Sequence, residues 1–334
     1  MMRATVEAGA RLHVGFGNLS LAHERLYGGV GLSLAEPRVR LSAVPTEGVR
    51  CTTGEGVAEA ATAVVRDHAT TACDLLGVSG AEVQVERALP RHVGLGSGTA
   101  TALTALTAIA RAHGHEPRPR ERAPAMGRGG RSGVGVAVFE RGGFVLDAGH
   151  PTERFTTEPP AQGDWTVPPV SARHPLPADW RVVLVLPDAE SGRHGSAEDE
   201  SMRAVVESAD PSVADELAAL TVRRLLPAAA EGRLHAFGDA VAEFGRLNGA
   251  WYADEQGGVY RPPAGRVVES LRTSTAVAGV GQSSWGPAVY ALTDATRADA
   301  ARQAATEALS AADAEGEVLV TRPRNTGAEV TTER

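Results

Sequence analysis

The sequence of 334 residues contains no lysine, so all 33 of its lysine-plus-arginine side chains are arginine. This absence excludes a Schiff-base lysine, a lysine general base and the lysine-containing Walker A loop. Any anion that binds to this chain must therefore be held by arginine, backbone N–H groups, hydroxyl groups or a metal ion.

The sequence also has few cysteines, no long apolar run and no net positive charge. Cys51 and Cys73 are too few for a disulfide scaffold or a zinc cluster of cysteines. No stretch approaches the roughly 18 apolar residues of a transmembrane helix, and the N-terminus has no apolar signal core. The net charge of −8 argues against nucleic acid as the main partner. We therefore expect a soluble, cytoplasmic protein that binds neither nucleic acid nor membranes.

The order of apolar patterns predicts an α+β fold with two domains, residues 1–170 and 171–334, joined by a Pro- and Thr-rich segment over 151–179. A hairpin is expected over 134–149, a glycine-rich turn over 26–34 and a frayed tail from 322 onward. The periodicity predicts strands at 4–14, 38–44, 81–89, 180–187, 277–280, 288–292 and 317–321, and helices at 57–76, about 100–113, 197–208, 211–229, 231–247 and 294–312.

The stretch GLGSGTA at 94–100 lies between a predicted strand and a predicted helix. Gly94, Gly96 and Gly98 would let the backbone approach an oxyanion, and the helix N-terminus would add free N–H donors. Ser97 and Thr99 could bind a phosphate or its Mg²⁺. The alternative is a tight turn in which one of these two hydroxyls caps the helix.

The stretch GRGGRSGVG at 127–135 places two arginines among five glycines. Flexible backbone and planar guanidinium groups suit a diphosphate or a carboxylate, so Arg128, Gly130, Arg131 and Ser132 are candidate site residues. The alternative is a solvated loop, which is how most Arg/Gly stretches behave.

Two further segments hold candidate binding residues. Arg11 and His13 lie at the end of a predicted strand, and Arg25 precedes a Tyr-Gly-Gly step, so these side chains could form an anion site. The alternative for a lone histidine is a structural side chain. Ser283 and Ser284 lie in a glycine-bounded turn over 281–287, which could line a pocket or could be a capped loop. The Tyr-Gly-Gly step consists of Tyr27, Gly28 and Gly29.

Together these segments resemble the GHMP superfamily of small-molecule kinases and their non-kinase relatives, in which 90–100 is similar to the glycine-rich phosphate motif. Within it, 11–13, 27–31, 127–135 and 281–287 resemble the β-ribofuranosylaminobenzene 5′-phosphate synthase family. The resemblance implies an N-terminal mixed α/β domain, a C-terminal ferredoxin-like domain and a homodimer.

Three positions depart from the patterns of these relatives. Kinases of the superfamily commonly place a catalytic Asp after a Ser-Gly-x step, where this chain has Gly135, and their loop usually reads Gly-Ser-Ser where this chain has Gly96-Ser-Gly98. Both differences favour the synthases over the kinases. The synthases generally carry Asp in their opening motif where this chain has Asn18, which would alter the handling of the acceptor.

The resemblance implies an enzyme that joins phosphoribosyl pyrophosphate (PRPP), with Mg²⁺, to an aromatic carboxylic acid and releases CO₂ and pyrophosphate. Residues 94–99 would hold the pyrophosphate, while His13, Arg131 and Ser132 would serve catalysis. Arg131 and Ser132 would hold the leaving group or the acceptor carboxylate. Arg11, His13 and Arg25 would hold the 5′-phosphate or a second carboxylate. The magnesium ligands stay unassigned.

The acceptor is the least determined part of this interpretation. A related group in the same family makes C-nucleoside antibiotics from an aminopyrazole. Asn18 and the lysine-free, Arg/Ala/Gly-rich composition favour 4-amino-1H-pyrazole-3,5-dicarboxylate over 4-aminobenzoate or 4-hydroxybenzoate. Two other hypotheses remain, an ATP-dependent kinase of a small alcohol and a catalytically silent protein that senses a metabolite.

Overall fold

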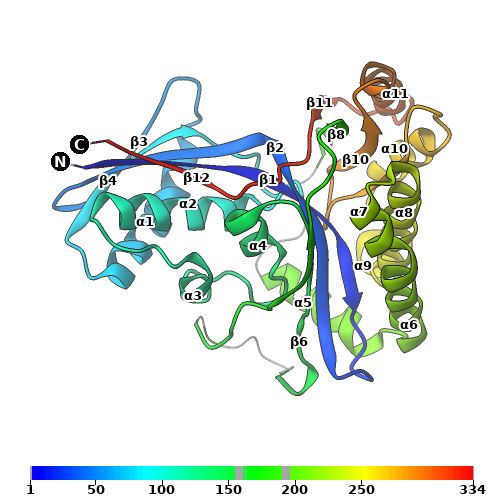
Figure 1. Ribbon diagram of the computed structural model, residues 1–334, viewed down its shortest axis with the longest axis horizontal. Coiled ribbons are helices and arrows are strands. Elements are labelled where there is room, and N and C mark those ends of the chain that lie inside the picture. Colours follow the sequence, from blue (N-terminus) through cyan, green and yellow to red (C-terminus); the bar gives the residue numbers. More distant parts are fainter. Residues whose placement is uncertain (1, 155–160, 162, 190–195, 334) are drawn as a thin grey trace.

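Two β-sheets, each covered by helices, make up the computed structural model, which describes residues 2–154, 161, 163–189 and 196–333 (Figure 1). The strands are β1 (Arg3–Asn18), β2 (Arg25–Pro45), β3 (Gly48–Thr53), β4 (Gly80–Arg87), β5 (Phe144–Asp147), β6 (His150–Pro151), β7 (Val170–His174), β8 (Trp180–Pro187), β9 (Gly279–Gln282), β10 (Val289–Asp294), β11 (Gly316–Thr321) and β12 (Glu329–Glu333). The α-helices are α1 (Ala60–Leu76), α2 (Ser97–Ala112), α3 (Pro119–Arg122), α4 (Val134–Arg141), α5 (Ser196–Ser208), α6 (Pro211–Leu220), α7 (Leu226–Glu231), α8 (Leu234–Trp251), α9 (Ala253–Gln256), α10 (Ala264–Arg272) and α11 (Ala298–Ala311). A 3₁₀ turn, η1 (Thr152–Arg154), follows β6, and a π-helical turn, η2 (Thr221–Leu225), joins α6 to α7.

The first sheet is built on the long antiparallel pair β1 and β2. Its strand order is β12-β1-β2-β4-β3, with β5 and β6 added to β2 and β7 added to β5. Only β3 and β4 run parallel among these pairs. Helices α1, α2 and α4 lie against one side of this sheet, and both chain termini lie at its far end (Figure 1). Because β7 and β12 pair in this sheet, the chain returns to it after residue 170.

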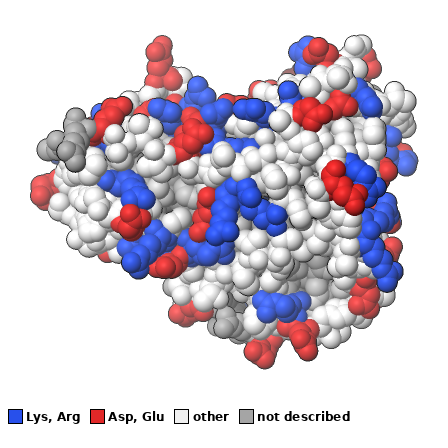
Figure 2. Space-filling model, in the orientation of Figure 1, with Lys and Arg blue, Asp and Glu red and all other residues white. Residues whose placement is uncertain are grey.

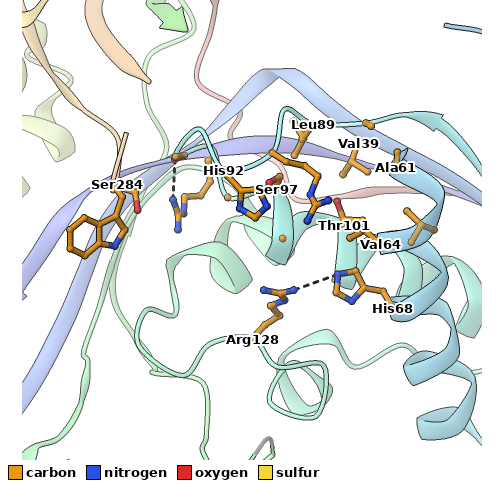
Figure 3. A pocket seen from close by; sticks show the side chains of 18 of the residues that line it. Val39, Ala61, Val64, His68, Leu89, His92, Ser97, Thr101, Arg128 and Ser284 are labelled. Atoms are coloured by element: carbon orange, nitrogen blue, oxygen red, sulfur yellow. Dashed lines mark hydrogen bonds between the residues drawn. The ribbon is translucent and has the colours of Figure 1, made fainter. Parts of the chain in front are cut away.

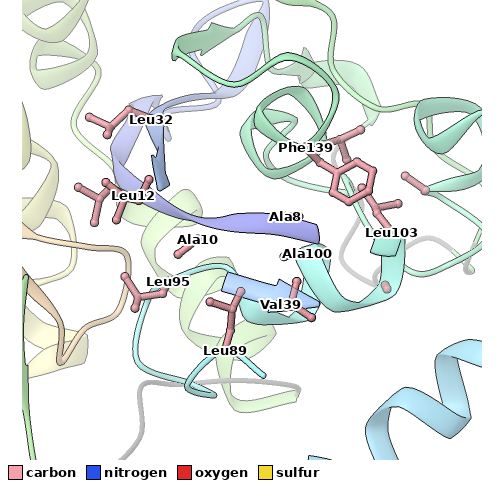
Figure 4. Close-up of a cluster of buried hydrophobic side chains, with 14 of the residues drawn as sticks. Ala8, Ala10, Leu12, Leu32, Val39, Leu89, Leu95, Ala100, Leu103 and Phe139 are labelled. Atoms are coloured by element: carbon pink, nitrogen blue, oxygen red, sulfur yellow. The ribbon is translucent and has the colours of Figure 1, made fainter. Parts of the chain in front are cut away.

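The helices under the first sheet follow from the spacing and size of their apolar residues. In α1 the buried residues Val65, Ala69, Ala72 and Cys73 recur at helical spacing, and Gly77 ends the helix in the left-handed conformation at φ 65°. Helix α2 is buried on nearly all sides, and its many alanines allow close approach to both the sheet and α1. Figure 4 shows Ala100 and Leu103 of α2 near Ala8 of β1 and Phe139 of α4.

The second sheet has the order β11-β8-β10-β9 with all neighbours antiparallel. Its chain order is a strand, several helices, two strands, a helix and a last strand, which is the ferredoxin-like arrangement that the sequence analysis expected. Val183 and Val185 of β8 face Ala301, Ala305 and the rest of α11 in a separate apolar cluster. The predicted α+β fold class is confirmed.

One predicted hairpin arm is wrong, because the stretch expected as a strand over 134–140 is the helix α4. Its valines favour a strand by propensity, and burial on most sides removes the polar face that would show helical spacing. The helix ends at Gly142, and β5 follows. The buried residues of α4 are Val134, Val136, Ala137, Val138 and Phe139.

Three segments predicted as irregular contain strands, and in the joining segment over 151–179 the strand is β7, which pairs with β5. The glycine-rich stretch over 26–34 lies inside β2, where a Cβ on Gly31 would be 2.2 Å from the Leu12 carbonyl oxygen. Glycine therefore serves close approach between β1 and β2 and makes no turn there. The tail predicted as frayed forms β12, which pairs with β1 from Arg3–Glu333 to Glu7–Glu329.

In the part of the chain that the structure describes, no helix is both long and apolar enough to cross a bilayer. Figure 2 shows acidic and basic side chains interspersed over the visible face, without a large area of one charge. The domain limits at residue 170 and the homodimer stay predictions.

Candidate active site

Two neighbouring cavities open where the first sheet meets α5 and the loop after β9. The large cavity measures about 950 Å³ and the small cavity about 340 Å³. The glycine loop, residues 94–99, borders the small cavity, and its last residue, Thr99, lines the large one. Both cavities are lined by Arg11, Arg128, Glu198, Ser284 and Trp285.

The glycine loop delivers the N-terminus of α2 to the cavities. Gly94 has φ 91°, and a Cβ there would be 2.1 Å from the Ser283 carbonyl oxygen, so no other residue fits. Gly96 is the residue before the helix, at φ 72°, and no side chain caps α2. The alternative in which Ser97 or Thr99 caps the helix is therefore not what the structure has. The first residues of α2, Ser97, Gly98 and Thr99, line the cavities, and a helix N-terminus in this place favours an anion.

Two arginines lie directly beside this helix N-terminus. A Cβ on Gly96 would be 3.3 Å from the Arg11 side chain, and one on Gly98 would be 3.0 Å from Nη1 of Arg128. The Arg11 Nη1 group donates to the Gly94 carbonyl at 3.3 Å. Among the residues described, the buried Nε atoms of both arginines have no hydrogen-bond partner. Unsatisfied cationic donors beside free helix N–H groups form a strong site for an oxyanion.

Burial lowers the pKa values of these two arginines and of a neighbouring histidine. Burial lowers the pKa of Arg11 to about 10 and also lowers the pKa of Arg128, while the charge of Glu198 opposes both changes. Nη2 of Arg128 lies 3.4 Å from Nε2 of His68, as Figure 3 shows. Burial, and then the Arg128 charge, lower the pKa of His68 to about 4. His68 is therefore neutral at pH 7 and leaves the positive charge to Arg128.

A chain of polar contacts connects β1, the loop before α4 and β5 next to the large cavity. Nε2 of His13 lies 3.3 Å from Oγ of Ser132, and that hydroxyl donates to Oδ2 of Asp147 at 3.2 Å. A Cβ on Gly29 would be 2.4 Å from the Ser132 Oγ and 2.8 Å from Oδ2 of Asp147. Glycine in β2 is what lets these side chains approach the strand. The pKa of His13 is lowered well below 6.5 by burial and by the Arg11 and Arg131 charges.

Arg131 faces two carboxylates of the first turn of α5. Its Nη1 lies 3.2 Å from Oε1 of Glu198, and its Nη2 lies 3.2 Å from Oδ1 of Asp199. Glu198 lines both cavities and Asp199 lines the large one. The negative charges of Glu198 and Asp199 therefore partly balance the positive charge of the arginines in the site.

Aromatic rings form another part of the large cavity. The ring centres of His13 and Phe16 lie 4.7 Å apart in an edge-to-face arrangement, and those of Phe16 and Tyr27 lie 5.3 Å apart. Trp165 donates its indole N–H to the Arg128 carbonyl at 2.9 Å, and Trp285 lines both cavities. This lining suits a planar aromatic ligand next to an anion site.

The structure brings most of the predicted site residues together, although they come from five separate stretches of the chain. Those that line the large cavity are Arg11, His13, Tyr27, Thr99, Arg128, Gly130, Arg131, Ser132 and Ser284. Those that line the small cavity are Arg11, Gly94, Gly96, Ser97, Gly98, Arg128 and Ser284.

Three residues predicted to contact substrate hold loops instead. The Asn18 amide donates to the carbonyls of Ser20 and Arg25 at 2.9 and 2.7 Å. The Arg25 guanidinium donates to the carbonyls of residues 148 and 149. The fully buried Ser283 hydroxyl donates to the Gly94 carbonyl at 2.7 Å and accepts the His13 N–H at 3.0 Å. Gly28 and Gly29 also lie outside both cavity linings.

The sequence analysis did not select several residues that shape the site. Glu198 and Asp199 lie in a charged run of α5 that reads as a solvated helix face, and Asp147 ends a short buried strand. Phe16 follows His13 by three residues, so its position near the Arg-Leu-His segment was the available signal. His68 and Trp165 carried none, because only the fold brings them to Arg128.

Comparison with known proteins identifies the family. The model of the GHMP kinases N-terminal domain matches residues 57–143, and that of the GHMP kinases C-terminal domain matches 225–311. The β-ribofuranosylphenol 5′-phosphate synthase of Methanothermobacter thermautotrophicus is 32% identical over 325 residues, 96% of each chain. The synthase of the same name from Archaeoglobus fulgidus is also 32% identical, over 96% of this chain and 97% of its own.

Solved structures agree on the fold. The crystal structure of homoserine kinase from Cytophaga hutchinsonii superimposes with a TM-score of 0.68 at 19% identity, over 98% of this chain and 97% of that one. At this identity the likeness concerns the fold alone. The domain matches and the two archaeal relatives, with the glycine loop and the arginines in one site, show that the chain belongs to the GHMP superfamily and, within it, to the family of the β-ribofuranosylphenol 5′-phosphate synthases.

Proposed function

We propose that this protein transfers the phosphoribosyl group of PRPP to a ring carbon of an aromatic carboxylic acid, with release of pyrophosphate and CO₂. The observation that carries the proposal is the joint lining of the two cavities. Arg11 and Arg128 border the glycine loop in the small cavity and also line the large cavity, whose lining includes the rings of Phe16, Tyr27, Trp165 and Trp285. One site can therefore hold a polyanion and a planar ring side by side.

The acceptor is better sought among para-substituted benzoates than among pyrazole dicarboxylates, which the sequence analysis favoured. The names of the curated relatives support a phenol-type product for those proteins. The structure also removes one reason for the pyrazole, because Asn18 bonds to loop carbonyls and lines neither cavity. We therefore propose 4-hydroxybenzoate or 4-aminobenzoate as the acceptor, with 4-amino-1H-pyrazole-3,5-dicarboxylate as the second candidate.

The chemistry that these residues support is substitution at C1 of the ribose. The ring carbon that bears the carboxylate attacks C1 from the side opposite to pyrophosphate, and loss of CO₂ restores aromaticity. The N-terminus of α2, Arg11 and Arg128 would stabilise the negative charge that develops on the leaving pyrophosphate. Their fixed positions also orient the donor, and the aromatic side chains of the lining would exclude some of the water that could hydrolyse it.

Mg²⁺ would enter this site with PRPP. In the described part of the chain no group of three or more His, Cys, Asp or Glu residues could hold a metal ion. Magnesium needs only one or two protein ligands when phosphate oxygens supply others, and Glu198, Asp199 and Thr99 line the large cavity. When bound, the ion would neutralise part of the pyrophosphate charge.

An ATP-dependent kinase is the competing function, and the site argues against it. The position that carries a catalytic Asp in kinases of the superfamily is Gly135 here. A Cβ at Gly135 would be 3.1 Å from Cγ2 of Thr99, so a side chain there would be crowded against the end of the glycine loop. The kinase structures that resemble this chain share its fold at low identity only.

The proposal is tested by incubating the purified protein with Mg²⁺ and PRPP and each of the three acids in turn. Pyrophosphate, CO₂ and the mass of the coupled product are followed, and ATP with homoserine serves as the kinase arm. We expect coupling with a benzoate and none without acid. Arg128→Gln should raise the KM for PRPP at least tenfold, whereas the matched exposed change Arg118→Gln should not. Phosphorylation without coupling would overturn the proposal.

A further inference from the structure

Asp147 is a buried carboxylate that lines neither cavity, yet it is one contact away from the site. Its side chain is 1% exposed at the end of β5. Oδ1 accepts the Gly149 N–H at 2.9 Å, and Oδ2 accepts the Gly133 N–H at 2.7 Å. Oδ2 also accepts the Ser132 hydroxyl at 3.2 Å. Burial raises the pKa of Asp147, and the N–H groups of Gly149, Gly29 and Gly133 and the Ser132 hydroxyl oppose that rise. The side chain is thus surrounded by donors, and the single proton of Ser132 is directed at it.

The orientation of the Ser132 hydroxyl determines which ring nitrogen of His13 carries the hydrogen. Because the Ser132 proton points at Asp147, its oxygen can only accept from its remaining neighbours, which are the Val134 N–H at 3.2 Å and Nε2 of His13 at 3.3 Å. Nε2 must then carry the hydrogen, and Nδ1 keeps a lone pair. Over the described ranges no hydrogen bond occupies Nδ1, and the ring lines the large cavity.

Burial, and then the neighbouring positive charges, lower the pKa of His13 and keep the ring neutral. Arg11 lies on the same strand, and Arg131 approaches from the loop before α4, and both disfavour the imidazolium ion. Tyr27 of β2 contacts the ring of Phe16, which in turn contacts the ring of His13. The Glu198 and Asp199 carboxylates of α5 are paired with Arg131. A neutral imidazole with a free Nδ1 lone pair is a hydrogen-bond acceptor at the aromatic part of the cavity.

We propose that Asp147 is a positioning residue that acts through Ser132 to present Nδ1 of His13 as the group that accepts the hydroxyl or amino proton of the aromatic acceptor. The inference rests on the proposed function and extends it. When Nδ1 accepts a hydrogen bond from the hydroxyl or amino group, the ring carbon opposite that group becomes more nucleophilic. In a para-substituted benzoate this is the carbon that bears the carboxylate. Acid–base assistance of this type contributes on the order of 10²-fold or more to a rate.

The step balances without another reactant. The ring carbon bonds to C1 of the ribose while the C1–O bond to pyrophosphate breaks and pyrophosphate keeps the electron pair. Once the ring carbon has bonded to C1, the hydroxyl or amino group of the aromatic acid is a much stronger acid than an imidazolium ion. Its proton therefore passes to Nδ1 although the free protein keeps the ring neutral, and this leaves a dienone, or the corresponding imine, that still carries the carboxylate. The bond to the carboxylate then breaks, CO₂ departs, and its electron pair restores the ring as the proton returns from Nδ1.

The test combines ¹⁵N NMR of histidine-labelled protein with kinetics. The expected wild-type spectrum has a pyrrole-type signal at Nε2 of His13 and a pyridine-type signal at Nδ1, with His13→Phe used for assignment. Ser132→Ala should convert these into a mixture of tautomers. It should lower kcat about tenfold with the KM for PRPP within twofold, and His13→Phe should lower kcat on the order of 10²-fold. Ser42→Ala, which removes a buried hydroxyl in β2 away from both cavities, is the control.

Asp147→Asn provides the second variant, with Glu7→Gln as its control because both replace a buried carboxylate by an amide. We expect a lower kcat and an altered tautomer ratio for Asp147→Asn and neither change for Glu7→Gln. A wild-type Nδ1–H tautomer with normal coupling would overturn this inference alone. Absence of coupling with every acid would overturn the proposed function together with the proton step, and an Nε2–H signal in that case would uphold the Asp147–Ser132–His13 contact chain.

Discussion

Replacing Arg11 by methionine should make the ligand-free protein more stable while it removes binding of pyrophosphate. Burial lowers the pKa of Arg11 from 12.5 to about 10, so the charged side chain is less favourable in the fold than in the unfolded chain. At about 1.4 kcal/mol per pH unit, the difference corresponds to roughly 3 kcal/mol. Partial hydration in the cavity and loss of the bond to the Gly94 carbonyl reduce the expected gain to about 2 kcal/mol.

The sign follows from proton binding. A base whose pKa is lowered by folding binds its proton more tightly in the unfolded chain, so its burial costs stability at every pH below about 10. Methionine has similar length and no charge to bury. For a chain of 334 residues the entropy of unfolding gives about 1.5 °C per kcal/mol, so Tm should rise by about 3 °C.

Urea and thermal unfolding with and without pyrophosphate measure both effects. The wild-type protein should gain about 2.7 kcal/mol when pyrophosphate is present at 100 times its Kd, and Arg11→Met should gain little at the same concentration. Arg38→Met is the matched control with the opposite sign, because a hydrogen bond to Glu7 raises the pKa of Arg38. A destabilised Arg11→Met that still responds to pyrophosphate would refute the reasoning.

Three further outcomes are expected. Because the pKa of His68 is lowered to about 4, the unfolded chain binds more protons between pH 6.5 and 4, so stability falls as the pH drops through this window. The shift corresponds to roughly 3 kcal/mol, and solvent screening of this partly exposed ring reduces the expected effect to about 2 kcal/mol. His68→Gln should flatten the urea-unfolding pH profile by that amount while its amide oxygen still accepts from Arg128. Thr99→Ala should raise the KM for PRPP several-fold in the coupling assay, since no side-chain cap is lost, and an unchanged KM would exclude its hydroxyl from the phosphate site. Arg131→Gln should raise the pKa of His13 in an NMR titration, because the Arg131 charge is one cause of its low value, and an unchanged pKa would show that burial and the Arg11 charge set it without Arg131.

The parts of the fold that the sequence predicts well are those whose patterns are local. The buried run Trp180–Pro187 and the spacing within α1 each indicate one element and its buried face. Helix α4 was missed because a helix buried on most sides shows no polar stripe, and its valines favour a strand. Strand β12 was missed because its order comes from the free edge of β1, more than 300 residues earlier in the chain.

The same distinction separates the predicted from the unpredicted parts of the site. Glycines that adopt left-handed conformations or allow close approach are visible in sequence, and they led to the loops at 94–99 and 127–135. Partners of the charged groups are not visible, because they depend on contacts across the chain. Ser132 lies 119 residues from His13, and Arg128 lies 60 residues from His68. A polar side chain in a glycine-rich segment also does not reveal whether it faces substrate or backbone, as Asn18 shows.

The arrangement of charge explains why a site this rich in arginine can exist in a folded chain. Arg11 and Arg128 have buried Nε atoms without partners in the described structure, and burial lowers the pKa of both. Glu198 opposes this effect on both side chains and pairs with Arg131 at 3.2 Å, so one carboxylate partly compensates three guanidinium groups. The incomplete compensation leaves positive charge at the N-terminus of α2. A polyanionic donor that binds there would recover the desolvation free energy of the arginines, which is how stability lost in the free protein becomes affinity for the substrate.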